Sequence, residues 1–262
     1  MQFSTPPAHP SIARNILNKV PEVTLFFWFI KIMSTTVGET AADFLNADLG
    51  LGLTGTSLVM GGLLAVALFF QVRAKRYVPT LYWLNVVLVS VFGTLITDNL
   101  SDHLGVPLAV STGVFSIALM AVFAIWYARE RTLSIHHVDS VPRELFYWLA
   151  ILITFALGTA AGDWFAEGLQ LGYAYSALIF GGVIAAVSFA RYVFKANAVL
   201  CFWLAYILTR PFGASLGDLL SQPHVNGGLG LGTTGTSALF LIAIIGLVGY
   251  LSFTQKRLGN ER

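Results

Sequence analysis

A three-residue pattern, Trp-x9-Gly-x4-Asp, occurs four times along the chain and constrains its fold more than any other feature. Its members are Trp28, Trp83, Trp148 and Trp203, Gly38, Gly93, Gly158 and Gly213, and Asp43, Asp98, Asp163 and Asp218. Self-similarity at a regular spacing indicates a protein assembled from copies of one structural unit. The pattern predicts four repeats, over residues 20–72, 77–128, 143–194 and 197–254, which two rounds of duplication would produce.

Each repeat contains two long apolar segments. A helix that crosses a bilayer needs about 20 mainly apolar residues, and eight segments qualify. They cover residues 23–45, 54–72, 79–101, 107–128, 144–167, 173–194, 198–221 and 234–254. Only 11% of the residues are charged, against about 25% in soluble domains. We therefore expect an all-α membrane protein, a single transmembrane domain (1–262) of eight helices. Its four parallel repeats would have a pseudo-fourfold or nested pseudo-twofold arrangement.

The basic residues predict the orientation of these helices. All fifteen Lys and Arg residues except Lys31 and Arg210 fall in the terminal segments or in alternate connections, on one side of the expected membrane. Cytoplasmic loops carry such an excess of positive charge, so both termini are expected in the cytoplasm. The net charge of +2 is too small to indicate nucleic acid as a partner, which leaves the lipid bilayer as the main one.

The repeated aspartates are the first candidates for function. Trp and Asp lie about 22 Å apart along a helix, which places the carboxylates in the outer third of the membrane if each Trp lies at the cytoplasmic interface. Ionisable groups inside a membrane usually mark ion or proton pathways, and carboxylates suit Mg²⁺, Ca²⁺ or Mn²⁺. We therefore take all four aspartates as candidate metal ligands. The alternative is that they cap helix ends and meet water.

The odd-numbered helices carry further polar residues on the same face, because residues four apart lie near one another on a helix. They include Thr94, Asp102, Thr159 and Glu167. In lipid, such a stripe must face protein or a water-filled cavity. The repeated glycines would let the four odd helices approach closely around an axis, with the aspartates lining a vestibule above them. The even helices would face lipid.

Three charged residues break the repeat. Glu39 lies one turn deeper than the aspartates, where it suits proton coupling, and Arg210 lies one further turn down on the last odd helix. A Glu39–Arg210 ion pair would neutralise both charges, and a structural and a coupling or gating role are compatible. Lys31 lies three residues after Trp28 and is expected to extend its amine to the cytoplasmic interface.

The segments TVGETAADFL and GLGLTGTS, with YWLAILITFALGTAAGDWFAEGL and YILTRPFGASLGDLLS, resemble a family of bacterial multi-pass proteins described as uncharacterised membrane-anchored proteins. The resemblance covers residues 19–250. It implies the bacterial inner membrane as the location and carries no activity.

These observations favour a cation transporter, most readily for a divalent metal such as Mn²⁺, with proton coupling through Glu39 as a further hypothesis. A cation channel is the near alternative. A non-transporting scaffold or sensor, in which the carboxylates are structural, is the alternative from another class. An enzyme acting on lipid head groups is weaker, because no Ser-His-Asp, HExxH or GxSxG arrangement occurs. No resident cofactor is expected, and the sequence leaves a homo-oligomer open.

Overall fold

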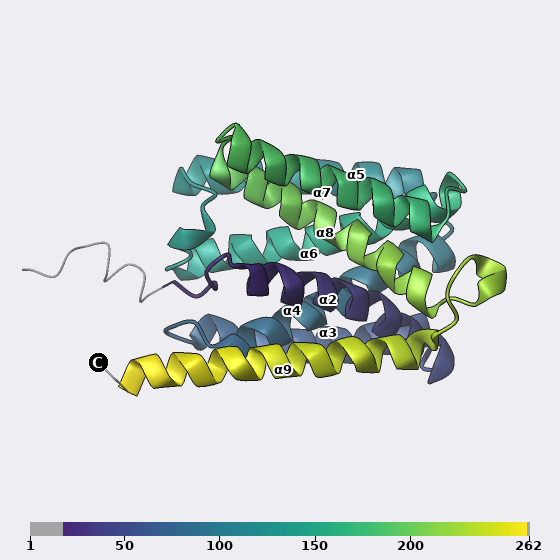
Figure 1. The fold of residues 1–262 in the computed structure, drawn as a ribbon, viewed down its shortest axis with the longest axis horizontal. Helices are drawn as coiled ribbons and strands as arrows, with labels where there is room; N and C mark the ends of the chain where they lie inside the picture. The colour runs from purple at the N-terminus through teal and green to yellow at the C-terminus, as the bar shows by residue number, and fades with distance from the viewer. Residues whose placement is uncertain (1–17, 261–262) are drawn as a thin grey trace, which may run out of the picture.

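The structure, a computed structural model, describes residues 18–260 as helices joined by short connections (Figure 1). Its long helices are α2 (Leu25–Asp43), α3 (Gly52–Arg73), α4 (Pro79–Asp98), α5 (Leu108–Glu130), α6 (Val141–Asp163), α7 (Tyr173–Val193), α8 (Ala198–Ser221) and α9 (Gly232–Asn260). These eight correspond to the eight expected spans. All except α2 are long and apolar enough to cross a membrane, which makes the chain a multi-pass membrane protein. Arg14, Arg262 and the side chain of Lys256, counted above, lie outside the described residues.

Local sequence determines where several helices begin. The Thr24 side chain accepts a hydrogen bond from the Phe27 amide at the start of α2, and Asn197 caps the Val199 and Leu200 amides of α8. Proline occupies the first turn of α4 and of α6, where its missing N–H has no partner to lose. Between these signals the apolar segments run without interruption, except that Pro211 lies inside α8.

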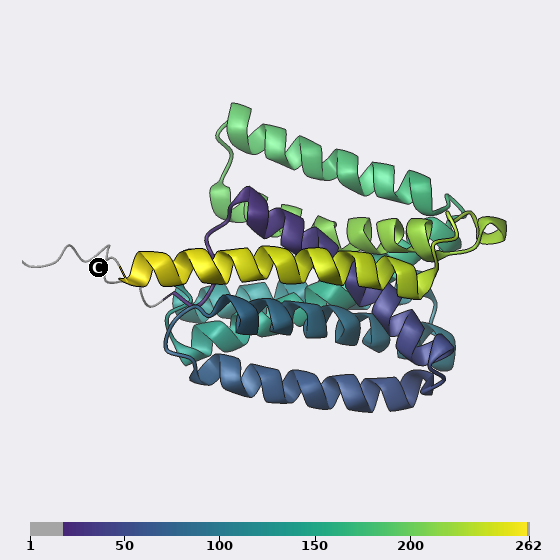
Figure 2. The same cartoon turned by 60° about the horizontal axis from the view of Figure 1, so that its bottom comes forward.

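Four helices, one from each repeat, form a closed inner ring. Helix α2 contacts α4 and α8, and α6 contacts the same two helices (Figure 2). The apolar windows of α4, α6 and α8 are 56–67% buried, whereas those of α3, α5, α7 and α9 are at most 22% buried. The even-numbered spans therefore form an outer layer around the ring, with most of their apolar surface uncovered by protein.

Each outer helix packs on the inner helix of the next repeat rather than on that of its own. Helix α3 packs on α4, α5 on α6 and α7 on α8, and the last helix, α9, packs on the first, α2 (Figures 1 and 2). The outer layer is thus offset by one repeat around the ring. Because α9 completes this arrangement, the final repeat closes the structure onto the first.

The repeated glycines lie where the inner helices meet. A Cβ atom added to any of them would collide with the residue seven positions after the tryptophan of the next repeat. These contacts pair Gly38 with Ser90, Gly93 with Phe155, Gly158 with Arg210, and Gly213 with Thr35. Small residues permit this approach between membrane helices, and the expectation that the glycines bring the odd helices together is confirmed.

This packing predicts that Gly93→Ala destabilises the protein, whereas Gly113→Ala does not. A Cβ at Gly93 would lie 2.6 Å from Cβ of Phe155 and 3.2 Å from the Ala156 backbone nitrogen, while Gly113 on the outer helix α5 has open space. Overpacking of this kind typically costs about 1–3 kcal/mol. Thermal unfolding of the detergent-purified variants measures the difference. Equal melting temperatures would contradict the close approach.

Candidate functional site

The repeated aspartates lie at the same end of the inner ring. Asp43, Asp98 and Asp163 are the last α-helical residues of α2, α4 and α6, and Asp218 lies three residues before the end of α8. Asp218 is 7% exposed, and the other three are intermediate. Glu39, one turn deeper on α2, is 6% exposed. The ring therefore concentrates five shielded carboxylates near one end of the membrane-spanning region.

A π-helical turn follows three of these aspartates. The segments η1 (Phe44–Asp48), η2 (Asn99–His103) and η4 (Trp164–Gly168) continue directly from α2, α4 and α6. Single π turns are rare and occur frequently at functional sites. Helix α8 instead stays α-helical past Asp218. The backbone conformation after the aspartate therefore differs in the fourth repeat, a difference that the regular Trp-Gly-Asp spacing does not reveal.

Three of the carboxylates form a compact group. One side-chain oxygen from each of Glu39, Asp163 and Asp218 lies within 4.8 Å of the others. Oxygen ligands lie about 2.0–2.6 Å from Mg²⁺ or Ca²⁺, so oxygens at this separation can share one ion. We call these three residues the carboxylate triad. It unites two of the four expected metal ligands with Glu39, and Asp43 and Asp98 are not members of it.

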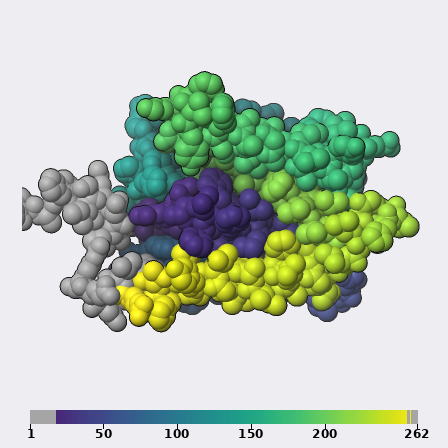
Figure 3. Space-filling view, viewed as in Figure 1, coloured from purple at the N-terminus to yellow at the C-terminus, as the bar shows by residue number. Residues whose placement is uncertain are grey.

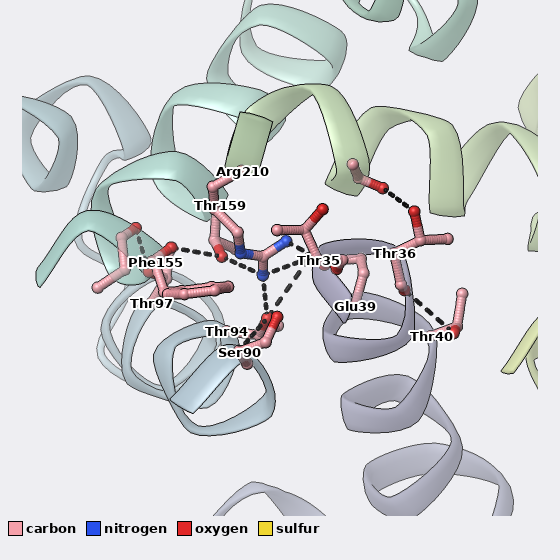
Figure 4. Close-up of polar contacts among 12 residues, drawn as sticks. Thr35, Thr36, Glu39, Thr40, Ser90, Thr94, Thr97, Phe155, Thr159 and Arg210 are labelled. Atoms are coloured by element: carbon pink, nitrogen blue, oxygen red, sulfur yellow. Dashed lines mark hydrogen bonds and ion pairs between the residues drawn. The ribbon is translucent and has the colours of Figure 1, made fainter. Parts of the chain in front are cut away.

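The Arg210 side chain occupies the centre of the ring directly below the triad and is fully buried. Its Nη2 donates to Glu39 Oε2 at 2.9 Å and to Thr159 Oγ1 at 2.7 Å, and it also donates to Thr94 Oγ1. Nη1 donates to the Thr35 carbonyl at 3.3 Å (Figure 4). One side chain from α8 thus contacts all three other inner helices, and the expected Glu39–Arg210 ion pair is present.

The same repeat position supplies the acceptors around Arg210. Glu39, Thr94 and Thr159 each lie eleven residues after the tryptophan of their repeat, and α8 has Ala214 there. Two threonines of the expected polar stripe therefore hold Arg210. The acidic members of the stripe lie at the mouth, where Asp102 is exposed and Glu167 accepts a hydrogen bond from Tyr173 at 3.0 Å.

Lys31 does not extend to the interface, so that prediction is wrong. The residue is fully buried, and its Nζ lies 4.0 Å from the Phe155 ring centre and 4.3 Å from that of Tyr206. Phe155 also lies 5.6 Å from the guanidinium carbon of Arg210. Aromatic faces attract cations, and they hold this amine inside the ring. A second basic side chain therefore lies in the protein core close to Arg210.

The charges of the ring do not balance. The ring carries five carboxylates, Glu39 and the four repeat aspartates. Within residues 18–260, Lys31 and Arg210 are the only Lys or Arg side chains inside the ring near them, because the other described basic residues lie at the opposite end of the spans. Asp48, Asp102 and Glu167 add further negative charge beside the mouth. Burying uncompensated charge is costly, so the site favours an added cation or protons.

A set of hydroxyl groups lies at the same end, near the start of the outer helices. Its members are buried, equivalent in the repeats and without a hydrogen-bond partner among the described residues: Thr56, Ser111, Ser176 and Thr236. The next residues in the chain show at which end of the inner helices these hydroxyls lie. Ser57 accepts a hydrogen bond from Asn99 of the inner layer, and Ser237 forms a hydrogen bond with Thr40. The set therefore places four unpartnered hydroxyls at the same end of the molecule as the carboxylates.

The opposite, basic end of the ring is closed. The Tyr82 and Tyr147 hydroxyls hydrogen-bond to each other inside it. Further toward the surface of this basic end, Lys19 Nζ donates to Glu144 Oε2 at 2.6 Å, and Gln71 Nε2 donates to Glu144 Oε1 at 3.1 Å. Lys19 belongs to the N-terminal basic segment, and nothing local in the sequence indicates this pair, because its partner lies 125 positions away.

Comparison with known proteins identifies one family. The model of the family described as a repeat of unknown function (DUF347) matches the chain four times, over residues 26–77, 81–132, 146–197 and 201–257. The chain therefore belongs to this family, and the four predicted repeats are present. No curated protein and no solved structure matches it.

The Arg210 network predicts a specific pattern of stability. Arg210→Gln should cost about 3–5 kcal/mol, because it leaves Glu39 buried without its charge partner. Adding Glu39→Gln to that variant should recover part of the loss, since neither charge then remains unpaired. Chemical unfolding of the wild type, both single variants and the double variant in detergent measures the coupling. Additive losses would contradict the pairing.

Proposed function

We propose that this member of the DUF347 family is a membrane carrier for a divalent cation such as Mn²⁺ and that the carboxylate triad is its binding site. The observation that supports this most directly is the approach of Glu39, Asp163 and Asp218 oxygens to within 4.8 Å. The three residues come from different inner helices. A change in how those helices pack would therefore alter the ligand geometry and with it the affinity for the ion.

The charge of the site favours a divalent ion over a monovalent one. The inner ring has three more carboxylates than Lys and Arg side chains. One divalent cation together with one proton would neutralise that excess. Carboxylate and hydroxyl oxygens suit Mg²⁺, Ca²⁺ and Mn²⁺, and the buried hydroxyls of the outer helices lie at the same end. Asp43 and Asp98 would attract the ion and pass it to the triad.

The centre of the ring favours a carrier over a channel. Arg210 contacts all the other inner helices, and Lys31 lies buried beneath it. Positive charges at these positions would repel a cation that moved straight along the axis. Transport would instead require the helices to shift, so that the triad loses contact with one side before it meets the other. The closed basic end and the acidic mouth fit a state open toward the acidic side.

We further propose that the acidic mouth faces outward and that the basic end and both termini lie in the cytoplasm of a bacterial cell. The excess of basic residues at one end supports this orientation. An acidic entrance would raise the local concentration of cations and speed their capture. Because every repeat contributes two spans, all four repeats would insert in the same direction and be related by an axis along the membrane normal.

Ion flux tests the carrier function. Purified wild-type protein in liposomes should take up Mn²⁺, and Asp163→Asn and Asp218→Asn should each abolish uptake because each removes a ligand charge. Asp102→Asn, an exposed carboxylate of the same end, is the matched control and should retain most of the flux. Absence of Mn²⁺, Mg²⁺, Ca²⁺ and proton flux in wild type would overturn the proposal, as would full transport by a variant with Asn at all four repeat aspartates.

Proton coupling is tested separately. If Glu39 exchanges a proton for the ion, Mn²⁺ entry into liposomes containing a pH-sensitive dye should release protons to the outside and make the lumen alkaline. Asp102→Asn, an exposed carboxylate of the same end, is the control and should keep both the flux and the pH change. Glu39→Gln should remove the pH change together with flux, because the exchanging group is lost. Mn²⁺ uptake by wild type without any pH change would show that transport proceeds without proton exchange.

A further inference from the structure

Two elongated cavities flank the first half of α8, at the basic end of the molecule. Slot 1, of about 480 Å³, follows α8 from Ala198 to Thr209 and has α2 and α7 as its other walls. Slot 2, of about 700 Å³, follows the opposite side of α8 from Asn197 to Ile207 and is walled by α5. Figure 3 shows the surface of α2, in purple, left uncovered between α7 and α9, on the side where slot 1 lies.

The dimensions of both slots match acyl chains. Slot 1 extends over twelve residues of α8, from Ala198 to Thr209, which corresponds to about 16 Å along the helix. A hydrocarbon core of about 30 Å gives each leaflet about 15 Å of chain. The walls are mainly apolar, with Ile32, Ile184 and Phe202 in slot 1 and Met120 and Leu204 in slot 2. Each slot can therefore hold one chain of a lipid from the leaflet at the basic end.

Positive charge marks the end where a head group would lie. Arg191 lines slot 1 and Arg131 lines slot 2, both exposed. Neither forms an ion pair with a described carboxylate, whereas Lys19, Arg143 and Arg210 do. Leu133 lines both slots, so they approach each other at this end. The two arginines thus offer unneutralised charge beside two adjacent apolar slots.

From this arrangement we propose that one anionic diacyl phospholipid binds astride the start of α8, with one chain in each slot and its phosphate between Arg131 and Arg191. The connection of residues 131–136, which joins the two halves of the repeat array, lies along both slots. The lipid would therefore fill the groove between α5 and α8 with one chain and the groove between α2, α7 and α8 with the other. This site is distinct from the carboxylate triad, and the proposal does not depend on ion transport.

Two matched sets of variants separate charge from shape. Arg131→Gln with Arg191→Gln removes the two head-group charges, and Arg73→Gln with Arg76→Gln removes two charges from the same end outside both slots. Ser188→Trp and Ser116→Trp fill slot 1 and slot 2 and leave both arginines in place. Each serine is partly exposed, so folding is checked first by the melting temperature without added lipid.

The experiment measures lipid retained by the full-length protein in detergent by native mass spectrometry, together with lipid-induced thermal stabilisation. The probes are dioleoyl phosphatidylglycerol, dioleoyl phosphatidylcholine, oleate and inorganic phosphate. Wild type and the Arg73/Arg76 control should each retain one phosphatidylglycerol and bind it at least about tenfold more tightly than phosphatidylcholine, a difference of about 1.4 kcal/mol. The Arg131/Arg191 variant should lose this preference, and each Trp variant should lose retention.

Four results would overturn the proposal. Equal binding of the two phospholipids by wild type would leave no role for the arginines. Stabilisation by phosphate or oleate equal to that by phosphatidylglycerol would assign the site to a free anion or a single-chain acid. An equal loss in the Arg73/Arg76 control would make the charge effect unspecific. Retention of no lipid by wild type would show that the slots are closed or filled by another part of the chain.

Discussion

The close approach of four helices at four glycines is the constraint on which the rest of this structure depends. Each glycine receives the side chain seven positions after the tryptophan of the next repeat, so the contact passes around the ring and returns to its start. Only at this separation can one arginine reach acceptors on three other helices. The offset of the outer helices by one repeat reinforces the closure, because α9 packs on α2.

The repeats form the ring, and departures from the repeat form the site. At the position eleven residues after the tryptophan, the first repeat has Glu39, whereas two of the others have threonine and one has alanine. One turn deeper, only the last repeat has an arginine. These two substitutions meet as an ion pair in the centre. Glu39 also belongs to the carboxylate triad, so a bound cation and Arg210 would compete for the same carboxylate. That competition offers a physical basis for coupling ion binding to helix packing.

Several features of the fold could be predicted because their signals repeat. The length of the apolar segments predicted the eight helices, and the spacing of the glycines predicted the contact between the inner helices. The Glu39–Arg210 pair was predicted from the positions of the two residues within their repeats, which lie one helical turn apart. The predicted position of the Lys31 amine was wrong, because the short distance from Trp28 along the helix was taken to mean that the amine reaches the membrane interface. The rings of Phe155 and Tyr206 instead hold the amine inside the helix ring. The π turns after three aspartates have no comparable sequence signal, since the residues that follow differ between repeats.

The sequence by itself determined the membrane character, the four repeats and the level of the carboxylates, because hydrophobic length and fixed spacing act locally along each helix. Only the tertiary structure decided which carboxylates meet. The four aspartates are equivalent in the repeat, yet Asp163 and Asp218 join Glu39 while Asp43 and Asp98 do not. Side chains from different helices converge according to how the helices turn and pack. That geometry depends on contacts between residues far apart in the chain, which no local pattern specifies.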